Sequence, residues 1–204
     1  MNKLGDLSCK EFLTELASAA PAPGGGGGAA MAGALAAALA SIAKEKFADR
    51  EPEVKELLEQ AEAERVRLLT LVDEDAAVFN SFMSCYKLPK TTDEEKAART
   101  AAIRAAAKQA ATVPMNIARS SFAVLKLADR LVVSGNPGVI TDGACSGLLA
   151  RAALRCAEYN VRINLGLTKD EAWNAQAAAE LKQLLAEAET LENRLLAVTD
   201  KALQ

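Results

Sequence analysis

The sequence has no histidine, and this absence removes whole classes of active site. Without imidazole there is no Ser-His-Asp or Cys-His catalytic group, and the commonest protein ligand for metal ions is missing. Any acid–base chemistry must therefore use Asp, Glu, Lys, Tyr or Cys. The four cysteines form no C-x-x-C pair, so we expect reduced thiols and no metal site. These cysteines are Cys9, Cys85, Cys145 and Cys156.

The chain also lacks a leader-like segment, a membrane span and an excess of positive charge. Residues 1–10 are polar and charged, which argues against a secretory signal. The small-residue segment 29–43 is too short and too weakly apolar to span a bilayer. The net charge of −3 and the isoelectric point of about 5.2 leave no broad basic surface for nucleic acid. We therefore expect a cytoplasmic protein that binds neither nucleic acid nor membranes.

Aromatic residues make up only 4% of the 204 residues, whereas alanine, leucine and glutamate are abundant. This composition is typical of closely packed helices, and no segment shows the sustained alternation of a strand. We predict one all-α domain over residues 1–204, a helical bundle with long, partly kinked helices and two glycine-containing turns. The predicted helices span residues 8–19, 27–48, 52–85, 92–132, 141–164 and 168–202.

Hydroxyl and proline residues indicate the helix boundaries. Three predicted capping boxes, at 8–11, 92–95 and 168–171, each place a Ser or Thr three residues before a Glu. Pro114 lies inside the predicted helix 92–132, where it removes a backbone donor and should kink or split that helix. The second glycine-containing turn is predicted at 135–138.

Five consecutive glycines, Gly24–Gly28, follow two prolines and open the predicted alanine-rich helix. Each glycine in a helix interior lowers helix stability by about 1 kcal/mol relative to alanine. Close packing alone therefore does not readily explain five consecutive glycines. One interpretation is a linker followed by a tightly packed core helix. The other is a ligand cradle, in which bare backbone N–H groups face a ligand at a helix start. The phosphate-binding signatures do not fit, because no strand precedes the glycines and no P-loop lysine follows.

Several polar residues lie where chemistry is feasible. In the acidic cluster 73–75, one carboxylate either lines a pocket with a raised pKa or serves only as a cap or ion-pair partner. Asp142 either caps a helix or meets a ligand at its start, and Asn164 either caps a helix end or faces a ligand. Lys90 and Arg99 flank a turn and could face an anionic group. A non-catalytic helical dimer, whose glycines permit close packing, explains the same pattern.

A series of short motifs follows in order along nearly the whole chain. They are Pro23-Gly24-Gly25-Gly26, Leu71–Phe79, Leu88–Lys96 with Arg99, Val113-Pro114, Gly135-Asn136, Thr141-Asp142 and Asn160–Leu165. In this order the motifs resemble the formiminotransferase-cyclodeaminase C-terminal domain family. Its free-standing relatives are formimidoyltetrahydrofolate cyclodeaminases and methenyltetrahydrofolate cyclohydrolases. Two positions depart from the family pattern: Gly27 stands where the family often has serine, and Thr141 replaces the serine of a Ser-Asp pair.

The resemblance implies an all-α homodimer that acts on the one-carbon bridge between N5 and N10 of tetrahydrofolate. The first expectation is a formimidoyltetrahydrofolate cyclodeaminase, which releases ammonia and forms 5,10-methenyltetrahydrofolate. A methenyltetrahydrofolate cyclohydrolase is the alternative on the same scaffold. The substrate is then a tetrahydrofolate derivative, and no tightly bound cofactor is expected.

The resemblance also implies roles for individual residues. Asp142 is expected to be the general acid/base, with Asp75 as a second carboxylate near the cationic bridge. The residues expected to bind substrate are Gly24, Gly25 and Gly26 against the flat pterin, Asn136, Thr141 and Asn164 at its polar edge, and Lys90 and Arg99 at the glutamate carboxylates.

Overall fold

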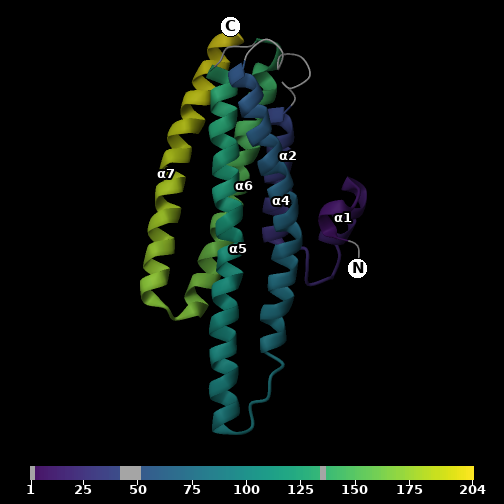
Figure 1. Ribbon diagram of the computed structural model, residues 1–204, viewed down its shortest axis with the longest axis vertical. Coiled ribbons are helices and arrows are strands. Elements are labelled where there is room, and N and C mark those ends of the chain that lie inside the picture. Colours follow the sequence, from purple (N-terminus) through teal and green to yellow (C-terminus); the bar gives the residue numbers. More distant parts are fainter. Residues whose placement is uncertain (1–2, 42–51, 134–136) are drawn as a thin grey trace.

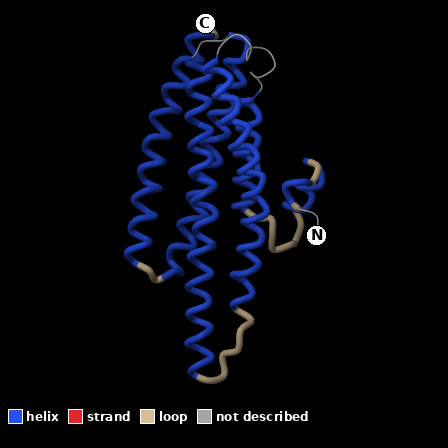
Figure 2. Tube along the Cα trace, in the orientation of Figure 1, coloured by secondary structure: helices blue, strands red, loops and turns tan. Residues whose placement is uncertain are grey.

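The computed structural model describes residues 3–41, 52–133 and 137–204, and the described residues form helices without any strand (Figures 1 and 2). This confirms the predicted all-α class. The elements are η1 (Leu4–Asp6), α1 (Cys9–Leu16), α2 (Gly25–Ser41), α4 (Pro52–Cys85), α5 (Asp93–Val133), η2 (Pro137–Val139), α6 (Ile140–Thr168) and α7 (Glu171–Ala202). None of the helices in this part of the chain is long and apolar enough to cross a membrane.

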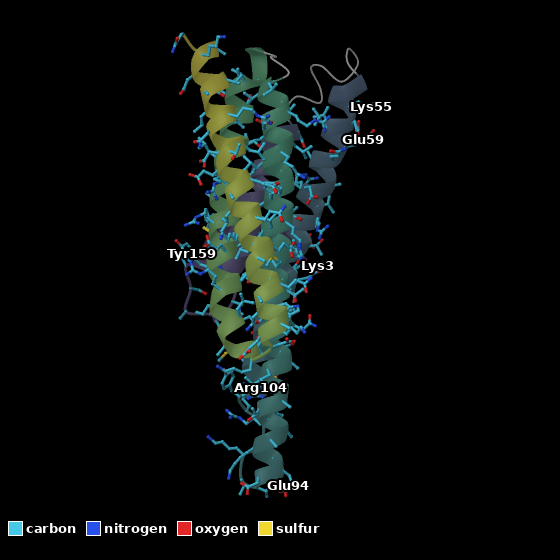
Figure 3. All side chains as sticks on the ribbon, turned by 90° about the vertical axis from the view of Figure 1, so that its left-hand side faces the viewer. Lys3, Lys55, Glu59, Glu94, Arg104 and Tyr159 are labelled. Carbon is cyan, nitrogen blue, oxygen red and sulfur yellow. The ribbon has the colours of Figure 1, made fainter. Side chains whose placement is uncertain are left out.

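The long helices run side by side, and α1 lies apart from them on one flank (Figure 1). Helix α6 packs against α5 and α2, whereas α7 lies along the outside of α5 and α6. The C-terminal end of α4 and the N-terminal part of α5 extend beyond the other helices. Together with the connection at residues 86–92, we call this projection the hairpin arm. Glu94 lies near its tip (Figure 3).

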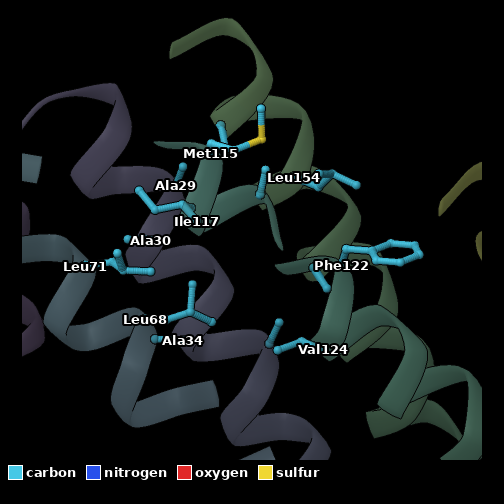
Figure 4. Close-up of a cluster of buried hydrophobic side chains, with 14 of the residues drawn as sticks. Ala29, Ala30, Ala34, Leu68, Leu71, Met115, Ile117, Phe122, Val124 and Leu154 are labelled. Atoms are coloured by element: carbon cyan, nitrogen blue, oxygen red, sulfur yellow. The ribbon is translucent and has the colours of Figure 1, made fainter. Parts of the chain in front are cut away.

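Small side chains bring α2 into the centre of the bundle. Ala30 and Ala34 of α2 are buried near Leu68 of α4 and Ile117 of α5 (Figure 4). A Cβ on Gly33 would lie 3.0 Å from Ser121 Oγ and 3.1 Å from a Leu68 methyl group, so α2 approaches both neighbours closely. The alanine and glycine content of the sequence therefore permits close helix packing.

The helix starts confirm two of the three predicted capping boxes. The Ser8 hydroxyl accepts from the Glu11 N–H, and Thr92 accepts from the Glu95 N–H at 3.2 Å. The prediction of a box at 168–171 is wrong, because α6 continues to Thr168 and Asp170 is the N-cap of α7, accepting from the Trp173 N–H.

Three predicted boundaries also need correction. The helix predicted over 8–19 ends at Leu16, and the helix predicted over 141–164 continues to Thr168. The helix predicted from residue 27 begins at Gly25, because its first turn is built from glycines, and residues 42–48 of that prediction lie outside the described residues.

Pro114 does not split α5, which runs without interruption from Asp93 to Val133. A proline has no N–H, so the carbonyl of Ala110, four residues earlier, lacks its usual helical donor. The side-chain amide of Asn164 on α6 donates to this carbonyl at 3.0 Å. A side chain from the neighbouring helix therefore supplies the hydrogen bond that the proline removes.

An ion pair between a buried carboxylate and a largely exposed guanidinium joins α5 to α7. The Asp129 carboxylate is 2% exposed and accepts from Arg194 Nε at 2.8 Å, with a second hydrogen bond from the Arg194 Nη2 group. We expect Arg194→Met to lower the free energy of unfolding by about 1 to 3 kcal/mol, because the carboxylate keeps its burial and loses its donors. Urea denaturation checks this, with Lys182→Met as control, since Lys182 is an exposed lysine of the same helix. Equal losses for the two variants would contradict it.

Candidate active site

A cavity of about 290 Å³ lies where the first turn of α2 meets α4, α5 and α6. Its lining is mainly apolar with a few polar groups, as is usual for small-molecule sites. The lining residues are Pro21, Ala22 and Gly24–Gly26 before and in α2, Asp75, Val78, Phe79 and Phe82 of α4, Ala110, Val113 and Pro114 of α5, and Asn160, Ile163, Asn164 and Leu167 of α6.

Asp75 is the carboxylate of this cavity. Burial raises the pKa of its carboxyl group above the ordinary value, and a hydrogen bond from the Gly27 N–H offsets part of this rise. The N–H belongs to the first turn of α2, where unpaired backbone donors and the helix dipole favour a negative charge. Of the acidic cluster, Asp75 alone lines the cavity: Asp73 accepts from the Leu4 N–H at 2.6 Å, and Glu74 is exposed.

The glycines at the start of α2 leave space for specific neighbours. A Cβ on Gly26 would lie 2.1 Å from Asp75 Oδ1, so the carboxylate occupies the place where a side chain would be. A Cβ on Gly25 would lie 3.4 Å from Asn160 Nδ2. A Cβ on Gly24 would meet nothing within 4 Å. The glycine run therefore leaves room for the Asp75 carboxylate and exposes backbone without side chains to the cavity. This arrangement is the one that the interpretation as a ligand cradle predicts.

Asn164 and Asn160 present their amides from successive turns of α6. Both hydrogens of Asn164 Nδ2 are used, by the Ala110 carbonyl at 3.0 Å and the Asn160 carbonyl at 2.8 Å. Its Oδ1 is therefore left as the acceptor that a ligand N–H can meet. Asn160 Nδ2 donates to the Cys156 carbonyl at 2.9 Å and has a second hydrogen to offer. Because α6 continues past Asn164, this residue is not a helix cap.

Lys90 and Arg99 lie on the hairpin arm and outside the cavity lining. Arg99 donates to the Tyr86 carbonyl at 3.2 Å, and its guanidinium lies 5.5 Å from the centre of the Tyr86 ring. Lys90 is exposed in the connection between α4 and α5. Arg99 precedes Ala110 of the cavity by 11 residues in α5, which is about 16 Å along the helix. Only an extended ligand could contact both places.

Asp142 and Thr141 lie in the first turn of α6, at the opposite end of the helix from the cavity. Asp142 precedes Asn160 by 18 residues, or about 27 Å along the axis. The structure therefore does not bring Asp142 and Asp75 together within one chain. Val139 is the N-cap of α6, so Asp142 is not the cap either. Asn136 lies outside the described residues.

Among the cavity residues that the sequence did not single out as site candidates are one amide, Asn160, and two aromatic residues, Phe79 and Phe82. Asn160 precedes Asn164 by one helical turn, and this spacing was a signal that both amides share one face. Phe79 and Phe82 lie among many other apolar residues of α4. The local sequence therefore cannot show whether a phenylalanine lines a cavity or packs in the core. In the structure Phe79 is 37% exposed and Phe82 is 9% exposed.

Comparisons with known proteins give the family of the chain. The model of the formiminotransferase-cyclodeaminase family matches residues 8–183. A protein named methenyltetrahydrofolate cyclohydrolase, from Methylorubrum extorquens, is 42% identical over 197 residues, which cover 94% of this chain and 95% of that relative. The formimidoyltransferase-cyclodeaminase of Sus scrofa is 32% identical over 89% of this chain but only 35% of its own length.

A solved structure extends the likeness to three dimensions. The crystal structure of formiminotetrahydrofolate cyclodeaminase from Thermotoga maritima has a TM-score of 0.85 and 29% sequence identity, and the match covers 98% of each chain. The family model, the relatives and the fold agree over nearly the whole sequence. This chain belongs to the formiminotransferase-cyclodeaminase family.

Proposed function

We propose that this chain catalyses a reaction at the one-carbon bridge between N5 and N10 of tetrahydrofolate, and that its reaction is that of a methenyltetrahydrofolate cyclohydrolase. The observation that carries the proposal is the Asp75 carboxylate, held at the glycine-built start of α2 inside an apolar cavity. The 42% identity to a cyclohydrolase, over nearly the full length of both chains, supports this choice of reaction.

In cyclohydrolysis, water attacks the carbon of the cationic methenyl bridge. Both protons leave the water oxygen: a base takes one, and the other is transferred, overall, to N5 as the bond from the carbon to N5 breaks. The formyl group stays on N10. The Asp75 carboxylate takes the proton and stabilises the positive charge of the bridge by its own negative charge. A pKa raised by burial suits this task, because a stronger base at neutral pH accepts the proton more readily.

Other residues of the cavity and of the hairpin arm orient the pterin ring and the aminobenzoyl-glutamate tail of the folate. Asn164 Oδ1 accepts from the N–H groups along the polar edge of the pterin, and the open backbone at Gly24 contacts its flat face. Phe79 and Phe82 continue along α4 from Asp75 toward the hairpin arm and pack against the aminobenzoyl ring. The glutamate carboxylates then follow the arm toward Arg99 and Lys90.

The cyclodeaminase reaction is the second candidate, and the Thermotoga maritima structure supports it. Here N10 attacks the formimino carbon, the bond from that carbon to its terminal nitrogen breaks, and ammonia leaves. The departing nitrogen gains two protons, one from N10 as N10 bonds to the carbon and one from Asp75 in its protonated form, and the product carries the same cationic bridge.

One absorbance assay decides between the two reactions. Loss of the methenyltetrahydrofolate absorbance on adding enzyme to that compound supports the cyclohydrolase. Appearance of this absorbance from the formimino compound, with release of ammonia, supports the cyclodeaminase. Absence of both reactions, together with no heat of binding for tetrahydrofolate in calorimetry, would overturn the proposal in favour of a non-catalytic helical protein.

We further propose that the protein works in the cytosol as a homodimer, without a metal or a tightly bound cofactor. The residue types of the cavity support a reaction without a metal, since acid–base chemistry by a carboxylate needs none. Turnover unchanged after dialysis against a chelator, and a dimeric mass in sedimentation, are the expected results.

A further inference from the structure

Three aromatic residues follow Asp75 at intervals of about one helical turn. They are Phe79, Phe82 and Tyr86, and we call them the aromatic row. Phe79 and Phe82 line the cavity, whereas Tyr86 follows the last residue of α4 and begins the connection of the hairpin arm. The aromatic row therefore leads from the cavity into the arm, which projects beyond the other helices (Figure 1).

Tyr86 supports the ring of Phe82 from outside the cavity. The two ring centres lie 5.3 Å apart, and the ring planes make an angle of 83°. This edge-to-face arrangement is one that aromatic pairs prefer. Phe82 is 9% exposed, whereas Tyr86 is 41% exposed. A ring as exposed as that of Tyr86 can support its neighbour only if it is itself held in place.

Arg99 holds both the ring and the backbone of Tyr86. Its guanidinium lies 5.5 Å from the centre of the Tyr86 ring, which places the cation where it is attracted to the ring. Its Nε and Nη2 groups donate to the Tyr86 carbonyl at 3.4 Å and 3.2 Å. This carbonyl lies beyond the end of α4, and Pro89, three residues later, has no N–H to offer. Arg99 of α5 therefore fixes the end of α4.

The same hydrogen bonds occupy the part of Arg99 that best recognises a carboxylate. The Nε and Nη2 groups form the fork that pairs with two carboxylate oxygens, and here both donate to the Tyr86 carbonyl. Lys90 differs in this respect, because it is exposed and forms no ion pair within the described part of the chain. Of the two cations on the arm that were expected to meet the glutamate, Lys90 is therefore the better placed.

We propose that Arg99 is a positioning residue, which acts through Tyr86 on Phe82, and that Lys90 rather than Arg99 binds the glutamate of the folate. Phe82 is the wall against which the aminobenzoyl ring packs, so this effect on the substrate rests on the proposed function. The contacts from Arg99 to Tyr86 and from Tyr86 to Phe82 are present without any substrate.

Two substrates separate positioning from glutamate binding. Methenyltetrahydrofolate carries the glutamate, whereas methenyltetrahydropteroate has the same aminobenzoyl ring without it. Arg99→Ala should raise KM about 3- to 10-fold for both, with kcat nearly unchanged, because ring packing is lost equally in the ground state and the transition state. Arg104→Ala is the matched control, an exposed arginine of the same helix (Figure 3), and should change neither KM. An increase confined to the substrate with glutamate would overturn the proposal.

Variants of Tyr86 and Lys90 complete the comparison. Tyr86→Ala removes the supporting ring and should raise both KM values, as Arg99→Ala does. Tyr86→Phe keeps the ring and should restore the parent values, because no described residue pairs with the hydroxyl. Lys90→Ala should raise KM mainly for the substrate with glutamate. Impaired binding in Tyr86→Phe as severe as in Tyr86→Ala would overturn the role of the ring.

Fluorine NMR tests the support of Phe82 without any turnover. With fluorophenylalanine at the five phenylalanine positions, the Phe82 signal is the one that disappears in Phe82→Leu, and the other four signals show that a variant remains folded. Arg99→Ala should shift or broaden the Phe82 signal, whereas Arg104→Ala should leave it in place. An unchanged Phe82 signal in Arg99→Ala would overturn the positioning role. A parent that converts neither folate would overturn the proposed function, and the Phe82 signal would still decide whether Arg99 holds the ring.

Discussion

Replacing Asp75 by asparagine is expected to reduce turnover by about 10² to 10⁴-fold, the typical cost of losing a general acid or base. Asparagine has nearly the same size and can still accept the hydrogen bond from the Gly27 N–H, so the cavity keeps its shape. What it cannot do is take up or release a proton. Steady-state kinetics with methenyltetrahydrofolate measure the effect, and Glu74→Gln on the exposed side of α4 is the control.

The same variant has an expected pH signature. Because burial raises the pKa of Asp75, the folded state disfavours the ionised carboxylate relative to the unfolded chain. The contribution of Asp75 to the stability of the parent is therefore greatest at pH values below 3.8, the ordinary pKa of the carboxyl group. This contribution is lost as the pH rises through the raised pKa of the folded state. The unfolding free energy of Asp75→Asn relative to the parent should thus increase with pH. In the parent, cyclohydrolase turnover should rise with pH through the same ionisation. A pH-independent difference in stability would contradict the assignment.

Gly26→Ala is expected to impair turnover nearly as severely as the loss of the carboxylate. The new Cβ would be placed 2.1 Å from Asp75 Oδ1, far inside van der Waals contact, so the carboxylate must leave the start of α2. It then loses the Gly27 N–H and its position beside the one-carbon bridge, since a displacement of about 1 Å in a catalytic group can cost 10²-fold in rate.

Gly28→Ala is the matched control for this variant. Gly28 lies in the same first turns of α2, and its added Cβ would lie 3.9 Å from a Leu16 methyl group, an ordinary contact. This variant should keep its turnover and gain up to about 1 kcal/mol from helix propensity. Equal turnover for Gly26→Ala and Gly28→Ala would show that the position of the Asp75 carboxylate does not matter to the reaction.

The sequence patterns predicted the helices well where local signals are strong. The predicted helix 52–85 has the same bounds as α4, and the capping boxes at Ser8 and Thr92 are present. Local chemistry between a hydroxyl and the N–H groups beside it determines these ends. The box predicted at 168–171 failed because tertiary packing carries α6 one turn further than its local signals indicate.

The candidate site was only partly predictable, because it depends on which helices meet. The glycine run, Asp75 and Asn164 come together as the family resemblance implied. The distance between Asp142 and Asp75 follows instead from the length of α6, and no local pattern reports how a second chain packs. The family resemblance likewise implied that Arg99 binds substrate, but Arg99 lies three helical turns before Ala110, the first cavity residue of α5.

The hydrogen bond from Asn164 to the Ala110 carbonyl makes the residue at position 164 depend on the residue at position 114. If Pro114 became alanine, its new N–H would compete for the same carbonyl and release one hydrogen of the Asn164 amide. The acceptor that faces the cavity would then be free to rotate. Substitution of Pro114 is therefore constrained by Asn164. In homologous sequences, these two residues should either both be kept or both be replaced.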